Sequence, residues 1–244
     1  MVEFFANSLV QGFLDSNLTG QAIVLAQLIG SVVMVACAIG KWRQLKDQKT
    51  TMRRVSRDVM GGHDVLGYYL ARRPNMHSAI ENIYNATCER MLKLLSPDVR
   101  AEVMAGTSTT AAAITTHEME LVKALCDHML DEEEIRIEKG MGMISTVVAL
   151  SPMLGLLGTV WGVLDAFAQM GGGGANGGTF SISDIAPSIS SALVTTVVGL
   201  LVAIPGVVAY NRMSAIIRGL VADMEGFADD LLGRLALDYQ GRNV

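Results

Sequence analysis

The segment from Gly140 to Asn211 contains no lysine, arginine or histidine, and its only acids are Asp165 and Asp184. Charged groups are costly in hydrocarbon, so a long apolar segment without them is typical of membrane-spanning helices. Asp165 falls near the outer end of the second predicted span and is expected to be interfacial, and no predicted span contains Glu, Lys, Arg or His. This pattern argues against the chain alone as the proton carrier, because a proton relay needs a titratable group at membrane depth. It also argues against an intramembrane enzyme, since the serines of the segment have no His or Lys in any predicted span to act as a base.

Cysteine and metal-ligand patterns are scarce as well. Cys37, Cys88 and Cys126 are isolated, without a C-x-x-C pair, which argues against a disulfide framework and favours reduced thiols. The four histidines show no spacing typical of a metal site, and the glycines of 171–178 lack the Lys-Ser/Thr of a phosphate-binding loop. We therefore expect no metal and no cofactor. A net charge of −5, without a basic stripe interleaved with aromatic residues, excludes nucleic acid as a partner.

Hydrophobic residues are what the chain has in excess. They make up 50% of its 244 residues, and the mean hydropathy is +0.37. That is too apolar for an ordinary soluble domain of this length, while 18% charged residues leave room for a substantial part in water. Together with the order of apolar and charged segments along the chain, this predicts an all-α polytopic membrane protein with three transmembrane helices, extended into a helical cytoplasmic region.

The order of these segments follows from hydropathy and charge. We predict an outer-side N-terminal segment (1–21), a first span (22–40), a cytoplasmic helical region (41–139), a second span (140–170), an outer-side Gly-rich loop (171–185), a third span (186–209) and a cytoplasmic C-terminal helix (210–244). Seven cations between Lys41 and Arg57 follow the first span, so the positive-inside rule places the N-terminus outside and the C-terminus in the cytoplasm. The acidic run 131–134 is expected to be a solvated helix face.

Small and hydroxyl-bearing residues recur at helical spacing in the second and third spans. They are Ser151, Gly155, Gly158, Thr159 and Gly162 in the second span, and Ser188, Ser191, Ala192, Thr195, Thr196, Gly199, Ala203 and Gly206 in the third. Two such stripes either pack helices closely, which is the commoner use of small residues in membranes, or form the wall of a shared pore. Periodicity alone leaves both readings open.

A specific combination of motifs surrounds these stripes. Gly158-Thr159-Val160-Trp161-Gly162 is followed in the next span by Ala192-Leu193, Thr195-Thr196, Gly199-Leu200 and Ala203-Ile204-Pro205, with Tyr210-Asn211-Arg212 after it. Over about residues 140–235, this combination resembles the ExbB/TolQ/MotA family of proton-channel proteins, and it is closest to the TolQ and ExbB branch.

The resemblance implies an assembly and a function. It implies a homopentamer in the bacterial inner membrane, around a central pore that encloses the single-span helices of an ExbD/TolR/MotB-like partner. A lone Asp on that partner would carry the proton. The complex would convert the proton motive force into mechanical work on the cell envelope, as in Tol-Pal or TonB-type energisation, and a TonB- or TolA-like protein is implied as a further partner.

Residue by residue, Thr159 and Thr196 match the family threonines that face the partner's Asp. The other hydroxyls expected along the proton pathway are Thr195, Ser191 and Ser151, because hydroxyls can hold water and stabilise a carboxylate. The residues expected to shape helix packing are Gly155, Gly158, Trp161, Gly162, Gly199 and Pro205. One departure stands out, because Ser191-Ala192-Leu193 replaces the E-A-L that TolQ and ExbB usually carry.

Other readings remain at this point. The chain could be a non-conducting membrane scaffold or adaptor whose stripes only pack helices, or a gliding- or flagellar-type stator subunit. A solute transporter is disfavoured, because three unequal spans show no internal repeat.

Overall fold

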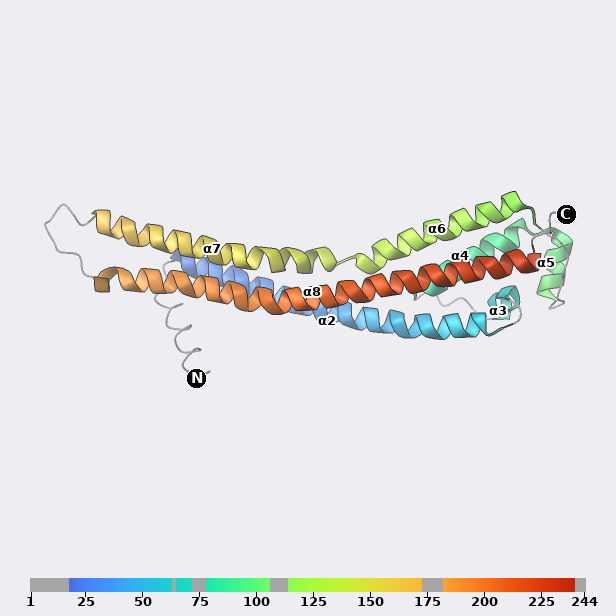
Figure 1. Ribbon diagram of the computed structural model, residues 1–244, viewed down its shortest axis with the longest axis horizontal. Helices are drawn as coiled ribbons and strands as arrows, with labels where there is room; N and C mark the ends of the chain where they lie inside the picture. The colour runs from blue at the N-terminus through green and yellow to red at the C-terminus, as the bar shows by residue number, and fades with distance from the viewer. Residues whose placement is uncertain (1–17, 63–64, 72–77, 106–113, 173–181, 240–244) are drawn as a thin grey trace. The chain divides into compact units, whose positions relative to one another are not determined.

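The computed structural model describes residues 18–62, 65–71, 78–105, 114–172 and 182–239. Their secondary structure is helical, as predicted (Figure 1). The helices are α2 (Leu18–Met60), α3 (Val65–Ala71), α4 (Ala79–Leu94), α5 (Pro97–Met104), α6 (Thr116–Glu138), α7 (Met141–Gly172) and α8 (Ile182–Tyr239). Most of the outer-side N-terminal segment and of the Gly-rich loop lies outside the described residues.

Three of these helices are long and apolar enough to cross a membrane. They run over Leu18–Gly61, Met141–Met170 and Ile185–Tyr239, so the expectation of three helices able to span a membrane is confirmed by their length and composition. The first and third continue well past the hydrophobic segments predicted from sequence, and no proline interrupts α2 after Gly40 or α8 after Tyr210.

The chain divides into two compact units, and α2 and α8 contribute to both. Unit 1 comprises Met1–Lys41 and Gly140–Arg212. Unit 2 comprises Trp42–Lys139 and Met213–Val244.

Unit 1 contains the three apolar segments of α2, α7 and α8, which lie side by side (Figure 1). Large hydrophobic side chains remain exposed on all three, which in water would be an unusually large apolar surface. They include Leu28, Ile29, Val32, Leu156, Val160, Leu164, Leu201, Ile204 and Val208. The small residues lie between the helices instead. Such an arrangement suits lipid outside and close backbone contact inside.

Unit 2 packs around an aromatic cluster centred on Tyr84 of α4. The ring of Tyr84 makes edge-on contacts with Tyr68, Tyr69 and Phe227, at centroid distances of 6.1 Å, 6.1 Å and 6.4 Å. Its hydroxyl donates to the Val65 carbonyl at 2.7 Å, so this buried polar atom has a partner. The cluster therefore joins α3, α4 and α8.

Side chains cap the end of α2 and the start of α6 in unit 2. Arg234 of α8 donates to the carbonyls of Met60 and Gly62, at 2.6 Å and 3.0 Å, where α2 ends. At the start of α6, Thr115 and Glu118 form a capping box. The hydrogen bonds from the Thr115 backbone N–H and from its hydroxyl hold the pKa of Glu118 below its usual value.

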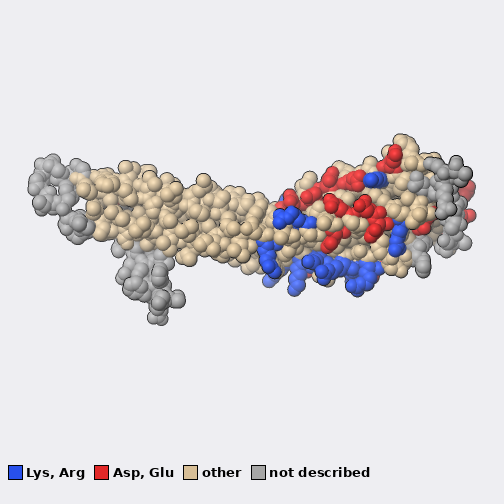
Figure 2. Space-filling model, viewed as in Figure 1, with Lys and Arg blue, Asp and Glu red and all other residues tan. Residues whose placement is uncertain are grey.

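Charged side chains gather on unit 2, whereas the face of unit 1 in the same view shows almost none (Figure 2). The acidic run 131–134 of α6 is not uniformly solvated, and that prediction is wrong for Glu133. Glu133 is 4% exposed, accepts a hydrogen bond from Asn82 of α4 at 2.7 Å, and pairs with Arg136 at 2.9 Å. Its burial follows from the packing of α4 along α6.

Candidate functional site: the seam between the apolar helices

The two stripes of small residues face each other inside unit 1. A Cβ placed on Gly155 of α7 would lie 2.9 Å from the Cα of Thr196 and 3.0 Å from the carbonyl oxygen of Thr195. A Cβ on Gly162 would lie 2.5 Å from the Cβ of Ala192. Real Cβ atoms do not approach other atoms so closely, so only glycine permits α7 and α8 to pack at this distance.

Two threonines of α8 bond to the same carbonyl of α7. The hydroxyl of Thr195 lies 3.1 Å from the Gly155 carbonyl oxygen and 2.7 Å from that of Ala192, so its one proton is shared between them. The hydroxyl of Thr196 donates to the Gly155 carbonyl at 2.9 Å. Thr195 is 1% exposed and Thr196 is half-buried. Gly155 is therefore the common point at which the two pathway threonines predicted in the third span, Thr195 and Thr196, attach to the neighbouring helix.

The remaining predicted hydroxyls bond within their own helices. Ser151 donates to Val147 at 2.7 Å, Thr159 to Leu156 at 2.7 Å, and Ser191 to Ser188 at 3.1 Å, in each case to the carbonyl oxygen. Ser151 and Ser191 are buried within the chain, whereas Thr159 is half-buried.

The residues expected to shape packing fall into two groups. Gly155, Gly158, Gly162 and Gly199 all lie at the seam, and a Cβ on any of them would collide with the facing helix. Trp161 is 47% exposed, and Pro205 is also exposed, so both lie on the outside of unit 1. A packing role for Trp161 and Pro205 stays a prediction, and within one chain the glycines alone make the close contacts.

Sequence reasoning assigned no role to Gln27, which the structure places at the same seam. Its side chain is 1% exposed, and its amide nitrogen donates to the carbonyl oxygens of Ser151 at 3.1 Å and Thr195 at 3.3 Å. The signal available was a long polar side chain in an otherwise apolar span. What the sequence could not show is that this one amide contacts both other helices.

Around Gly155 and Gln27 the polar seam carries no titratable side chain of its own. The nearest acid, Asp165 of α7, is half-buried beyond Gly162, and its carboxylate accepts a hydrogen bond from the Gln169 amide at 2.9 Å. The same amide nitrogen lies 3.5 Å from the Ser188 hydroxyl of α8, so Asp165 lies at one end of the seam, away from Gly155 and Gln27. Around Gly155 the seam therefore offers hydroxyls, carbonyls and one amide, which can bind water or stabilise a carboxylate but cannot themselves carry a proton across hydrocarbon.

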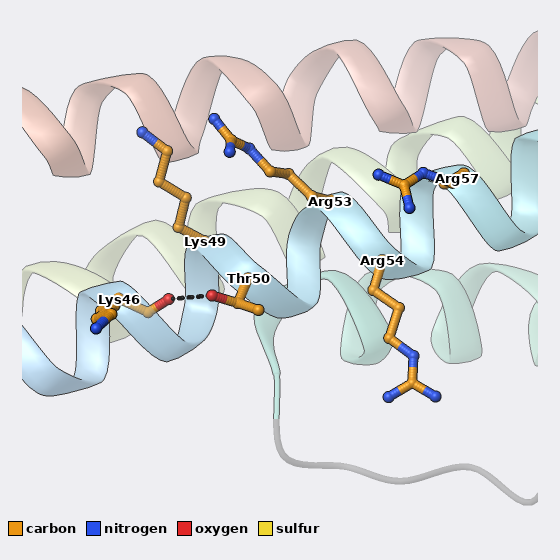
Figure 3. Close-up of a pocket in the computed structure, with 6 residues that line it drawn as sticks. All are labelled: Lys46, Lys49, Thr50, Arg53, Arg54 and Arg57. Atoms are coloured by element: carbon orange, nitrogen blue, oxygen red, sulfur yellow. Dashed lines mark hydrogen bonds between the residues drawn. The ribbon is translucent and has the colours of Figure 1, made fainter.

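A separate basic face lies on the unit 2 part of α2. Lys46, Lys49, Arg53, Arg54 and Arg57 surround an open hollow of about 400 Å³, together with Thr50. Lys49 and Arg53 point to one side of the helix and Arg54 to the other (Figure 3). Side chains that diverge in this way form a charged surface rather than a converging ligand site. They are typical of the cation-rich segment that follows a membrane span.

Comparison with known proteins agrees with this architecture. Residues 79–226, more than half of the chain, match the MotA/TolQ/ExbB proton channel family. The chain belongs to this family. It is 28% identical over 222 residues to the Tol-Pal system protein TolQ of Haemophilus influenzae, covering 89% of each chain. It is 27% identical over 228 residues to TolQ of Pseudomonas aeruginosa, covering 88% of this chain and 89% of that one.

Relatives of the second branch match over a shorter region. The biopolymer transport protein ExbB of Xanthomonas campestris is 37% identical over 112 residues, which are 46% of this chain and 43% of that protein. The resemblance stated from the sequence motifs, including its lean toward the TolQ and ExbB branch, is thereby confirmed.

Proposed function

We propose that this chain is a subunit of a proton-driven motor in the bacterial inner membrane, working with a single-span partner that supplies the proton-carrying carboxylate. The observation that carries the proposal is a buried seam rich in hydroxyls, within apolar helices that have no titratable group around Gly155. Membership of a proton channel family supports it, because the hydroxyls, carbonyls and single amide around Gly155 cannot themselves carry a proton.

The complex is proposed to be a homopentamer around a central pore that holds an ExbD/TolR/MotB-like partner. The N-terminus would lie outside and the C-terminus in the cytoplasm. Similarity to the Tol-Pal system protein TolQ and to the biopolymer transport protein ExbB supports energisation of the cell envelope as the task, through a TolA- or TonB-like protein.

Within the subunit, Thr159 and Thr196 are the proposed contacts for the partner's Asp. Both are half-buried in the single chain and so keep surface that another helix can cover. Thr195, Ser191 and Ser151 are the buried polar layer behind them, and of these three hydroxyls Thr195 is the one that bonds across from α8 to α7.

The proposed mechanism is a stepwise movement of the partner. Proton entry from the outer side neutralises the Asp, which releases it from one threonine position and lets it pass to the next. Each charge crossing the membrane potential gains about 2.3 kcal/mol per 100 mV, which is enough to bias steps between near-equivalent sites.

Thr196→Val and Thr159→Val test the proposal in cells, with Thr146→Val as the matched control. Thr146 lies on α7, is exposed, and donates only to the Gly142 carbonyl of its own helix at 2.8 Å. We expect the first two variants to lose proton-driven envelope function while still assembling with the partner, and the control to stay active. Full activity in both pathway variants would refute the threonine role.

A non-conducting scaffold is the second candidate, and one observation favours it. The hydroxyls of Thr195 and Thr196 are already engaged with Gly155 inside the chain, as helix packing alone would require. Proton flux into liposomes separates the two functions. If the complex is a motor, liposomes that contain both the chain and its partner must show proton flux. If the chain is only a scaffold, the same liposomes show no proton flux.

A further inference from the structure

Gln27 occupies a space that two glycines leave open. A Cβ on Gly199 of α8 would lie 2.9 Å from the amide nitrogen of Gln27, and one on Gly155 of α7 would lie 3.5 Å from it. The amide therefore sits where the backbones of α7 and α8 come closest, and an alanine at Gly199 would crowd it directly.

The two carbonyls that Gln27 binds belong to the turns that end at these glycines. In an α-helix the carbonyl of residue i accepts from the N–H of residue i+4, so Ser151 pairs with Gly155 and Thr195 with Gly199. One amide thus holds a turn of α7 and a turn of α8 at once. Moving α8 by a single residue would rotate the Thr195 carbonyl by about 100° and leave an N–H group unpaired in an apolar region.

The other end of the same amide has no partner. The Oε1 atom of Gln27 is buried without a hydrogen bond to any residue that the structure describes. Exchanging the amide's oxygen and nitrogen would not help, because it would place Oε1 against two carbonyl oxygens. An unpaired buried acceptor costs stability, and an apolar side chain of similar size would avoid that cost. A purely stabilising role therefore favours Leu or Met at this position rather than Gln.

We propose that Gln27 is a positioning residue: the first span fixes the register of the second and third spans, and with it the placement of Thr195 and Thr196. Its effect on proton-driven work rests on the proposed function, whereas its effect on helix register does not.

The register is measured on the full chain in lipid nanodiscs, by the distance between spin labels. Labels are attached to cysteines at Leu157 of α7 and Leu200 of α8, both exposed, with Cys37 replaced by Ala and labelled chains diluted with unlabelled ones. Gln27→Met keeps the length of the side chain and removes its donors. We expect the distance distribution to shift by at least about 1.5 Å, the rise of one helical residue, or to broaden to that extent.

Leu28→Met is the matched control, because Leu28 is the next residue and is 49% exposed on the same helix. It should leave the distribution unchanged. An unchanged distribution in Gln27→Met would overturn the proposal. If Gln27→Met fails to fold, Gln27→Asn replaces it, since the shorter amide cannot reach both carbonyls, and an unchanged distribution there would overturn the proposal equally.

A second readout separates positioning from simple stabilisation. Gln27→Met is expected to reduce proton-driven envelope function several-fold, while the unfolding midpoint and the amount of assembled complex stay close to those of the parent. If Gln27→Met loses function only in proportion to a loss of folded protein, the positioning role of Gln27 is contradicted. The distance measurement needs neither partner nor proton gradient, so its outcome does not depend on whether the proposed function is correct.

Discussion

Gly158 packs directly against the Thr195 side chain, because glycine has only a hydrogen atom where any other residue carries a Cβ. The ideal Cβ position at Gly158 collides with Oγ1, Cβ and Cγ2 of that threonine. Since Thr195 is itself bonded to Gly155, it has little freedom to move aside. The close approach of α7 and α8 thus depends on individual hydrogen atoms.

Gly158→Ala is expected to destabilise the chain by about 1–3 kcal/mol, the usual cost of inserting a methyl group into a tightly packed interior. Gly142→Ala is the control, because Gly142 lies on the same helix with nothing within 4 Å of its would-be Cβ. Removing a helical glycine there should be neutral, or stabilising by up to about 1 kcal/mol. Unfolding in mixed detergent micelles measures both, and equal stabilities would contradict the close contact.

Individual residues also decide reactivity in unit 2. Cys126 is fully buried, and burial raises the pKa of its thiol. Cys88 is equally buried, so neither thiol is accessible in the folded chain. Spin labels therefore react with neither of these two thiols in the folded chain, and only Cys37, which is half-buried, has to be replaced before labelling.

At the scale of elements, α4 and α6 are joined by a buried polar contact rather than by apolar packing alone. Glu133 lies among solvated acids in the sequence, yet its carboxylate is inside the contact between the two helices and is held by Asn82 and Arg136. A buried carboxylate needs such partners, because losing one leaves an unsatisfied charged group.

Asn82→Ala is expected to lower the free energy of unfolding by about 1–3 kcal/mol, since it removes one of the two partners of Glu133. Glu132→Gln is the control on the same helix. The Glu132 side chain is 60% exposed, and its change should stay within about 0.5 kcal/mol. Thermal unfolding of the full chain compares the two, and an Asn82→Ala variant as stable as the control would show that the contact contributes nothing.

At the scale of the whole molecule, three apolar helices and a strongly charged remainder set the topology. The cations that follow the first span predict that both the 41–139 region and the C-terminus lie in the cytoplasm. Two of the three membrane-spanning helices continue without a break into the charged part of the chain.

A fluorescent protein fused after Val244 is expected to fluoresce, because it would remain in the cytoplasm. Alkaline phosphatase inserted between Gly174 and Ala175 is expected to be active, because the loop would face the outer side. Reporter activity in whole cells checks both fusions, and the reverse pattern would overturn the predicted orientation.

The sequence by itself determined the three apolar helices, the charged remainder and the two stripes of small residues. These features depend on local composition and on helical periodicity, which are visible along the chain. Only the tertiary structure decided that the stripes meet at Gly155 and that Gln27 lies between them. The contacts of Gln27 join residues 124 and 168 positions apart, and no local pattern records which side chain will reach so far. The burial of Glu133 was missed for the same physical reason, because it depends on a neighbouring helix and not on the run of acids around it.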